Sequence, residues 1–140
     1  MGQVHFEDVN EGDEAPVITH KLTRTDLVRY AGASGDYNPM HHDEVLATAA
    51  GQPSVFGHGM FSMGLLGTAI TNYVGEGALT SYKVRFARQT WPDEELSTSI
   101  KVKNKRKEGD KDVVDLDVSL ANAAGEVKVV GEATAVLPHR

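Results

Sequence analysis

The order of hydrophobic and polar residues along the chain predicts a short strand and a helix near its start. Residues 16–22 alternate apolar and polar side chains, as half-buried strands do. The residues that follow are apolar at helical intervals, and Thr23 or Thr25 can cap the helix that they predict. We expect Gly32 and Gly35 to end this helix, because glycine is a poor helix former.

A longer helix is predicted at residues 59–74, after a short helix at 43–50 and a loop at 51–57. Its apolar residues lie on nearly every side, which is typical of a helix buried in a core. Each of its three glycines lowers the intrinsic helix stability by about 1 kcal/mol. We interpret them as positions where another element packs close to the helix backbone: Gly59, Gly64 and Gly67.

The second half of the chain has the period-two pattern of strands. Turn formers at residues 108–110 and 122–125 predict that the last three strands form consecutive hairpins. The predicted strands are residues 82–86, 96–105, 113–120 and 127–137. This order of elements predicts an α+β fold in which an antiparallel sheet wraps around the buried helix. Such a sheet leaves exposed edge strands, which favours a dimer.

Composition and charge narrow the classes of function. The 140 residues suit a single domain covering residues 1–140. A net charge of −6 argues against a broad basic surface, so we expect no nucleic-acid partner. The sequence has no cysteine, which excludes disulfides and a thiolate nucleophile. The first nine residues do not resemble a leader, and no stretch approaches the ~20 apolar residues of a membrane span, so we expect a cytoplasmic protein without a membrane partner.

The loop at residues 34–42 carries the strongest chemical signal. It reads Ser-Gly-Asp-Tyr-Asn-Pro-Met-His-His, with turn formers and polar side chains but no sustained period. Pro39 can rigidify a turn that aims the Asp36 carboxylate and the His41 imidazole into one cleft, where one water is held between them. Because a carboxylate shifts the titration of a nearby imidazole, we treat the two groups as a coupled pair.

Two other interpretations of these residues stay open at this point. The Asp36 and Asn38 side chains can simply stabilise a turn while the histidine stays solvated. His42, Asp43 and His58 are ligand types that suit zinc or iron, but no recognised ligand spacing is present. We therefore predict neither a metal nor another cofactor.

This loop, together with Gly-His-Gly-Met at residues 57–60, resembles the signature of MaoC-like, R-specific enoyl-thioester hydratases. The combination of Gly-Asp-x-Asn-Pro-x-His with a downstream His-Gly-Met is highly specific, and the resemblance extends over nearly the whole chain. Residues 22–30 are most similar to the catalytic subunit of the mycobacterial-type 3-hydroxyacyl-carrier-protein dehydratase. The resemblance implies a hot-dog fold and a reversible addition of water to the double bond of an acyl-CoA or acyl-carrier-protein thioester.

The resemblance also assigns roles to individual residues. Asp36 and His41 become the catalytic pair that activates one water. The Gly59 N–H lies at a predicted helix N-terminus, where it can stabilise the negative charge that develops on the thioester oxygen. The side chain of Ser62 can assist Asp36 or bond to its own helix. The candidates for substrate binding are Asn38, His58 and Ser62.

Basic residues are the remaining candidates for contacts with the substrate. The run at residues 101–107 is an ordinary feature of a solvated hairpin, but it can also contact coenzyme A phosphates or an acidic carrier protein. The same holds for Lys83, Arg85 and Arg88, which alternate outward on and after the preceding strand.

Two alternative functions share the expected fold. An acyl-CoA thioesterase lacks the Asp-x-Asn-Pro-x-His loop, and a non-catalytic acyl-binding subunit of a heterodimeric dehydratase has no need of Asp36 and His41. We therefore expect a hydro-lyase that forms a homodimer, or a heterodimer with a related hot-dog subunit. Acyl chain length, the carrier and the proton roles of the pair stay open at this point.

Overall fold

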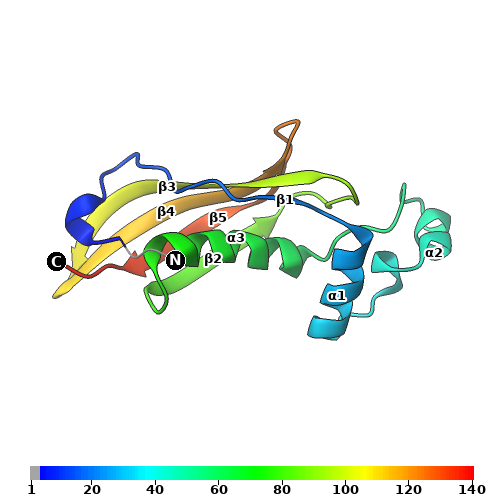
Figure 1. Cartoon of the computed structure of the whole chain (residues 1–140), viewed down its shortest axis with the longest axis horizontal. Helices are drawn as coiled ribbons and strands as arrows, with labels where there is room; N and C mark the ends of the chain where they lie inside the picture. Colours follow the sequence, from blue (N-terminus) through cyan, green and yellow to red (C-terminus); the bar gives the residue numbers. More distant parts are fainter. Residues whose placement is uncertain (1–3) are drawn as a thin grey trace.

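The computed structural model describes residues 4–140, so the first three residues of the N-terminal segment considered above lie outside it. Its largest element is one five-stranded antiparallel sheet with the strand order β1-β3-β4-β5-β2 (Figure 1). The strands are β1 (Thr19–Lys21), β2 (Leu79–Phe86), β3 (Glu95–Glu108), β4 (Lys111–Asn122) and β5 (Val127–Val136).

The last three strands form the consecutive hairpins that the turn residues predict. Gly109 and Gly125 have φ angles of 63° and 82° in the two turns, a left-handed conformation that glycine adopts without steric cost. β2 does not pair with β3, the next strand along the chain, but with β5 at the other side of the sheet. Residues 87–94 therefore cross the end of the sheet to join these two strands.

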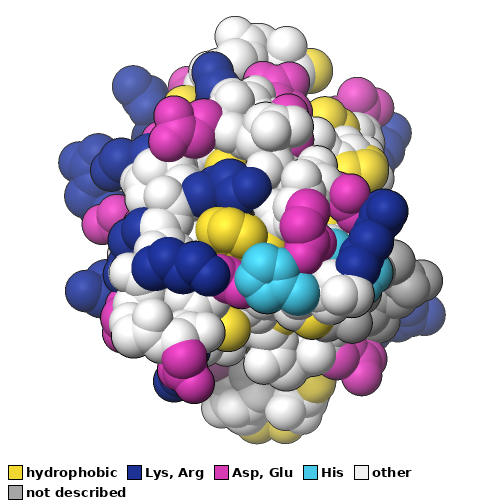
Figure 2. Space-filling model, turned by 90° about the vertical axis from the view of Figure 1, so that its left-hand side faces the viewer, with side chains coloured by type: hydrophobic (Ala, Val, Ile, Leu, Met, Phe, Trp, Pro, Cys, Tyr) yellow, Lys and Arg dark blue, Asp and Glu magenta, His cyan; other side chains and the backbone are white. Residues whose placement is uncertain are grey.

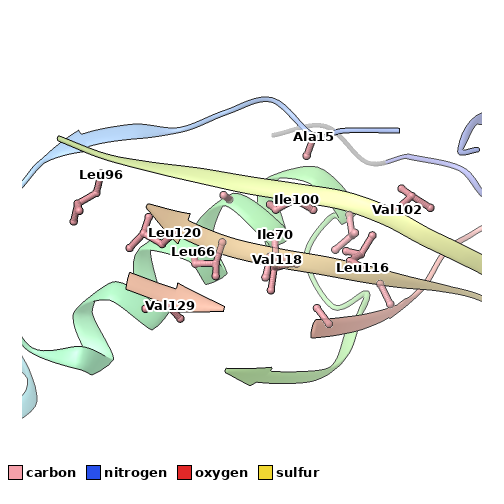
Figure 3. Close-up of a cluster of buried hydrophobic side chains, with 14 of the residues drawn as sticks. Ala15, Leu66, Ile70, Leu96, Ile100, Val102, Leu116, Val118, Leu120 and Val129 are labelled. Atoms are coloured by element: carbon pink, nitrogen blue, oxygen red, sulfur yellow. The ribbon is translucent and has the colours of Figure 1, made fainter. Parts of the chain in front are cut away.

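The helix α3 (Gly59–Val74) runs along one face of the sheet and contacts β2, β3, β4 and β5 (Figure 1). Leu66 and Ile70 are fully buried and pack among the apolar side chains of the sheet (Figure 3). Burying one such side chain contributes about 1.5–3 kcal/mol to folding. The partners from the strands include Ile100, Val102, Leu116, Val118, Leu120 and Val129. The predicted α+β arrangement, a sheet around one helix, is confirmed.

The helix α3 is the predicted central helix, but it is buried along the side that faces the sheet and not on nearly every side. Met60, Gly64, Thr68 and Asn72 are exposed, and their spacing of four residues makes them one row along the helix. The sheet covers the other side only, so this row faces away from the core. An added Cβ at Gly64 would meet no neighbouring atom, so the predicted close approach is wrong at that position.

Close packing does occur at another glycine of α3. An added Cβ at Gly67 would lie 3.3 Å from the ring of Tyr82 on β2. The Tyr82 hydroxyl donates a hydrogen bond to the Met63 carbonyl at 2.7 Å, and burial raises the pKa of this tyrosine to about 12. This contact ties the helix to the edge strand.

The helix α1 (Arg24–Ser34) begins where the sequence predicts. Thr23 accepts a hydrogen bond from the Asp26 N–H, and Asp26 accepts one from the Thr23 N–H, which forms a capping box. Gly32 lies inside the helix and does not end it, because one glycine costs less than the packing and cap contribute. Gly35 ends the helix in the left-handed conformation, with a φ of 75°.

Two short elements follow α1 beyond the end of the sheet (Figure 1). They are the 3-10 turn η2 (Pro39–His41) and the helix α2 (Glu44–Ala49). A further 3-10 turn, η1 (Phe6–Asp8), lies with the C-terminus at the opposite end of the molecule, where the Phe6 N–H donates to the Pro138 carbonyl. None of the helices among residues 4–140 is long and apolar enough to cross a membrane.

Candidate active site

A cavity of about 310 Å³ lies between the first turn of α3, η2 and the segment that follows β2. This volume is at the lower end of the range for small-molecule sites. Three of the six predicted site residues reach this cavity: His41, Gly59 and Ser62. The complete lining is His41, Phe56, Gly57, Gly59, Ser62, Phe86, Ala87, Arg88, Gln89, Thr90 and Val129.

The main chain holds His41 in one tautomer. The residue lies at the end of η2 and is only 8% exposed. Its Nδ1 atom is 2.6 Å from the carbonyl oxygen of Phe56. A carbonyl oxygen can only accept, so Nδ1 carries the proton and donates. In the neutral imidazole the other nitrogen, Nε2, then has a free lone pair.

This free nitrogen faces Asp36. Nε2 of His41 and Oδ2 of Asp36 are 3.9 Å apart, too far for a direct hydrogen bond. Two atoms at this separation can both hydrogen-bond to a single water oxygen. The Asp36 side chain is 51% exposed, so water reaches the pair from the carboxylate side. The structure thus brings together the two residues that the sequence predicts as a pair.

His58 supports this pair from the core side. The residue is buried, and its ring stacks on the ring of His41 with 3.9 Å between centroids and 27° between planes. Its Nε2 donates to the main-chain carbonyl of Asp36 at 3.1 Å. Burial lowers the pKa of His58, more than the hydrogen bond to that carbonyl raises it. His58 is therefore neutral at neutral pH and adds no charge beside the pair.

The same three side chains are of the types that bind metal ions. Ligand atoms of Asp36, His41 and His58 all lie within 4.8 Å of one another, and these ligand types suit zinc. Each ring has one lone pair to offer, because its other nitrogen donates to a carbonyl oxygen. However, the planes of the stacked rings differ by only 27° with 3.9 Å between centroids, so the lone pairs, which lie in these planes, do not meet at one ion. The arrangement suits a water better than a metal ion.

Gly59 supplies a free N–H at the edge of the cavity. It is the first residue of α3, where helix geometry leaves N–H groups without a partner, and no acceptor among residues 4–140 takes this one. A Cβ added here would lie 3.2 Å from the ring of Phe86. The missing side chain therefore leaves the N–H accessible from the cavity.

Comparison with known proteins agrees with this site. The family described as "MaoC like domain" matches residues 9–124. The chain belongs to the MaoC-like family. Its relatives include an (R)-specific enoyl-CoA hydratase of Rhodospirillum rubrum, 28% identical over 138 residues, which are 97% of this chain and 93% of the relative.

Two further relatives show the extent of the similarity. The 3-hydroxyacyl-thioester dehydratase Y of Mycobacterium tuberculosis is 39% identical over 82 residues, which are 56% of this chain and 28% of that protein. This chain thus matches little more than a quarter of that dehydratase. An R-hydratase from Pseudomonas aeruginosa superposes with a TM-score of 0.86 and 29% identity, over 99% of this chain and 88% of that chain. The predicted hot-dog fold of the MaoC-like family is thereby confirmed.

The remaining predicted residues of the MaoC-like site are Ser62, Asn38 and His58, and of these three Ser62 lines the cavity. The buried Ser62 hydroxyl has no hydrogen-bond partner among residues 4–140, so it does not bond to its own helix. Asn38 accepts a hydrogen bond from the Met40 N–H at 3.1 Å and caps η2, away from the cavity lining. His58 and Asn38 hold the loop, and their predicted contact with substrate stays a prediction.

One wall of the cavity is formed by residues that no motif in the sequence marks as part of a site. This wall comprises Phe86, the last residue of β2, and residues 87–90 after it. The Thr90 carbonyl accepts the Gly57 N–H at 2.8 Å, and a Cβ added at Gly57 would lie 2.2 Å from the Thr90 hydroxyl oxygen. The pairing of β2 with β5 brings this segment to the site, and no local sequence signal reports that pairing.

The basic run at residues 101–107 lies away from the cavity. Its last residues reach the β3–β4 turn, at the end of the molecule opposite α1 and α2 (Figure 1). Lys and Arg side chains on that end alternate with acidic ones (Figure 2). Arg106 pairs with Asp115 at 2.8 Å and lowers the pKa of that carboxyl to about 2, while Lys107 pairs with Asp112. Among the basic residues considered above, Arg88 lines the cavity.

Proposed function

We propose that this MaoC-like chain catalyses the reversible hydration of trans-2-enoyl thioesters to (3R)-3-hydroxyacyl thioesters. The observation that carries the proposal is the position of the free Nε2 of His41, which lies 3.9 Å from Asp36 Oδ2 and belongs to a residue that lines the cavity. The names of the hydratase and the dehydratase among the relatives support the same reaction class.

The protonation of the His41 and Asp36 side chains suggests how the water between them reacts. Nε2 of neutral His41 and the Asp36 carboxylate are both acceptors, so the water between them donates both of its protons. His41 takes one proton while the water oxygen forms a bond to the β-carbon. The same proton then passes to the α-carbon, because neither group carries another one to give. Elimination is the reverse of these steps.

Gly59 stabilises the intermediate charge in this proposal. Attack at the β-carbon moves an electron pair onto the thioester oxygen, and a fixed N–H at a helix N-terminus is stabilising there. The free N–H of Gly59 supplies that donor. Ser62, one turn later, lines the same cavity, and its hydroxyl has no hydrogen-bond partner among residues 4–140. This hydroxyl is closed off from solvent, so a rotation about the Cα–Cβ bond is needed before it can contact the bound thioester.

The proposed reaction uses no metal and no other cofactor. The stacked rings of His41 and His58 do not direct their lone pairs to one point, and a water needs no such convergence. A chelator added to the assay should therefore leave the rate unchanged. Acyl-CoA and acyl-carrier-protein thioesters are both substrates that this cavity can accept, and a cytoplasmic location stays a prediction.

Two other functions are distinguished by their products. A thioesterase would release free thiol and a carboxylic acid, and an acyl-binding partner subunit would bind thioester without turnover. The preformed Asp36–His41 pair favours hydration over both. A heterodimer with a related subunit stays an alternative to the homodimer.

The proposal is tested by mixing the purified protein with crotonyl-CoA and longer trans-2-enoyl-CoAs. Hydration removes the conjugated double bond, so the ultraviolet absorbance of the enoyl thioester should fall without release of free thiol. Release of thiol at the same rate would support the thioesterase instead.

A further inference from the structure

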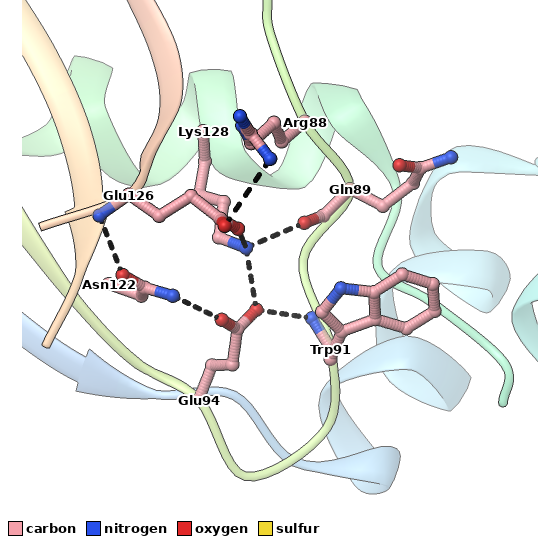
Figure 4. Close-up of polar contacts among 7 residues, drawn as sticks. All are labelled: Arg88, Gln89, Trp91, Glu94, Asn122, Glu126 and Lys128. Atoms are coloured by element: carbon pink, nitrogen blue, oxygen red, sulfur yellow. Dashed lines mark hydrogen bonds and ion pairs between the residues drawn. The ribbon is translucent and has the colours of Figure 1, made fainter. Parts of the chain in front are cut away.

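Lys128 is a fully buried charged residue close to the cavity (Figure 4). Its ammonium group donates hydrogen bonds to the Gln89 carbonyl at 2.9 Å and to the Glu126 carboxylate at 2.7 Å. It also forms an ion pair with the Glu94 carboxylate at 3.1 Å, so two carboxylates and a carbonyl surround the charge. A buried charge is costly unless it is paired this completely.

A β-bulge aims this side chain. Leu120 on β4 pairs with Val129, but the next residue, Ala121, pairs with Val127. Lys128 is therefore the extra residue between two paired positions. A bulge changes the direction of a side chain relative to the regular alternation, and here Lys128 reaches the segment that joins β2 to β3.

Lys128 and its partners hold this segment residue by residue. The N–H groups of residues 87 and 88 donate to the Lys128 carbonyl at 2.9 and 3.3 Å. The Lys128 ammonium donates to the Gln89 carbonyl, and the Trp91 N–H donates to Glu94 at 2.7 Å. Four of the five residues from 87 to 91 are thus bound to Lys128 or to its counter-ion, and Figure 4 shows the bonds to Gln89 and Trp91.

The segment held in this way forms one wall of the cavity. Residues 87–90 all line the cavity. Thr90 is 3% exposed, and its hydroxyl is buried against Gly57 without a hydrogen-bond partner among residues 4–140. Its carbonyl accepts the N–H of Gly57, two residues before Gly59. A shift of the segment would therefore change the shape of the cavity.

We propose that Lys128 is a positioning residue that fixes residues 87–91 as one wall of the acyl-thioester pocket and so sets the affinity for the thioester. The inference rests on the proposed function in assigning an acyl thioester to the cavity. Lys128 itself touches no substrate. Its loss should weaken binding more than it slows the chemical step, because Asp36 and His41 lie on a different segment.

The test compares Lys128→Met with the wild-type chain and with Lys111→Met, which changes an exposed lysine on β4. The dissociation constant of butyryl-CoA is measured by calorimetry, and KM and kcat are measured with crotonyl-CoA. Lys128→Met should raise the dissociation constant and KM by about 10-fold and change kcat by less than about 3-fold. Lys111→Met should leave all three unchanged. Unchanged binding in Lys128→Met would overturn the proposal.

A double variant separates positioning from stability. Lys128→Met removes the buried cation from between the partly exposed carboxylates of Glu94 and Glu126, which should lower the Tm by about 10 °C. Adding Glu94→Gln removes one of these charges and should recover much of the Tm. Binding should stay weak, because the Gln89 carbonyl still lacks its donor. Recovery of binding together with the Tm would show a merely structural role and overturn the proposal.

Amide hydrogen exchange gives a readout that does not depend on activity. Exchange should accelerate in the peptide covering residues 86–91 of Lys128→Met, while β3 and β4 stay protected. If Lys128→Met does not fold, the same measurements are made on Lys128→Gln, whose neutral side chain keeps a hydrogen-bond donor. A wild-type chain that binds butyryl-CoA but does not hydrate crotonyl-CoA would refute the proposed function and leave the Lys128 comparison intact.

Discussion

His41 donates from Nδ1 to the carbonyl oxygen of Phe56 at 2.6 Å, and this bond determines which nitrogen of the ring is free. The acceptor is a main-chain atom, so it cannot titrate or rotate away as a side chain can. Nε2 is consequently a base in the neutral ring, directed at Asp36. The chemistry of the site follows from this one contact.

Loss of either member of the pair should abolish most of the activity. Asp36→Asn and His41→Ala should each reduce kcat by at least about 100-fold, the usual contribution of an acid–base group. The matched control is His42→Ala, which removes an exposed neighbouring histidine whose ring contacts the Tyr37 carbonyl. Steady-state rates with crotonyl-CoA, with circular dichroism to check folding, measure the effect. Near-normal turnover by Asp36→Asn or His41→Ala would remove that residue from the mechanism.

Two glycines of α3 offer a matched pair for the proposed oxyanion donor. Gly59→Ala places a methyl group 3.2 Å from the Phe86 ring and beside the free N–H of residue 59. This variant should lower kcat by about 10-fold or more. Gly64→Ala meets open space and should raise the free energy of unfolding by about 0.5–1 kcal/mol with activity retained. Urea denaturation and initial rates measure the two effects. Equal rates for both variants would contradict the role of Gly59.

The pKa of His58 predicts how stability depends on pH. Burial lowers this pKa below the value of about 6.5 that an unfolded chain has. Between the two values the unfolded state binds more protons, so the free energy of unfolding should fall as the pH drops below about 6.5. In His58→Gln, which keeps a donor for the Asp36 carbonyl, the free energy of unfolding should fall less over the same pH range. Denaturant titrations from pH 7.5 to 5 measure this, and parallel curves for the two proteins would contradict it.

The sheet edges predict an oligomer. β2 has eight residues and pairs on one side only, and Phe86 at its end is 49% exposed. Two copies that join along such an edge would form one continuous sheet with a symmetric contact. We expect a dimer in sedimentation at micromolar concentration. A monomer under these conditions would rule out the homodimer and direct the search to a related partner subunit.

The sequence predicts those parts of the fold that depend on residues close together along the chain. The bounds of α3 follow from Gly59 and Gly75 around an apolar segment, and the hairpins follow from their turn glycines. The sequence also predicts the Asp36–His41 pair, because one short loop carries both residues. It does not predict the positions of Thr90 and Lys128, because these depend on the pairing of β2 with β5 and on a bulge between distant strands.

The stereochemistry of the product tests the central claim most directly. A single water held between Asp36 and His41 can reach only one face of the β-carbon, and its proton returns to the α-carbon from the same side. Hydration of crotonyl-CoA in deuterated water, followed by chiral analysis of the product, should give the (3R)-hydroxyacyl thioester with syn addition. A (3S) product, or free coenzyme A without any hydroxyacyl thioester, would contradict the account.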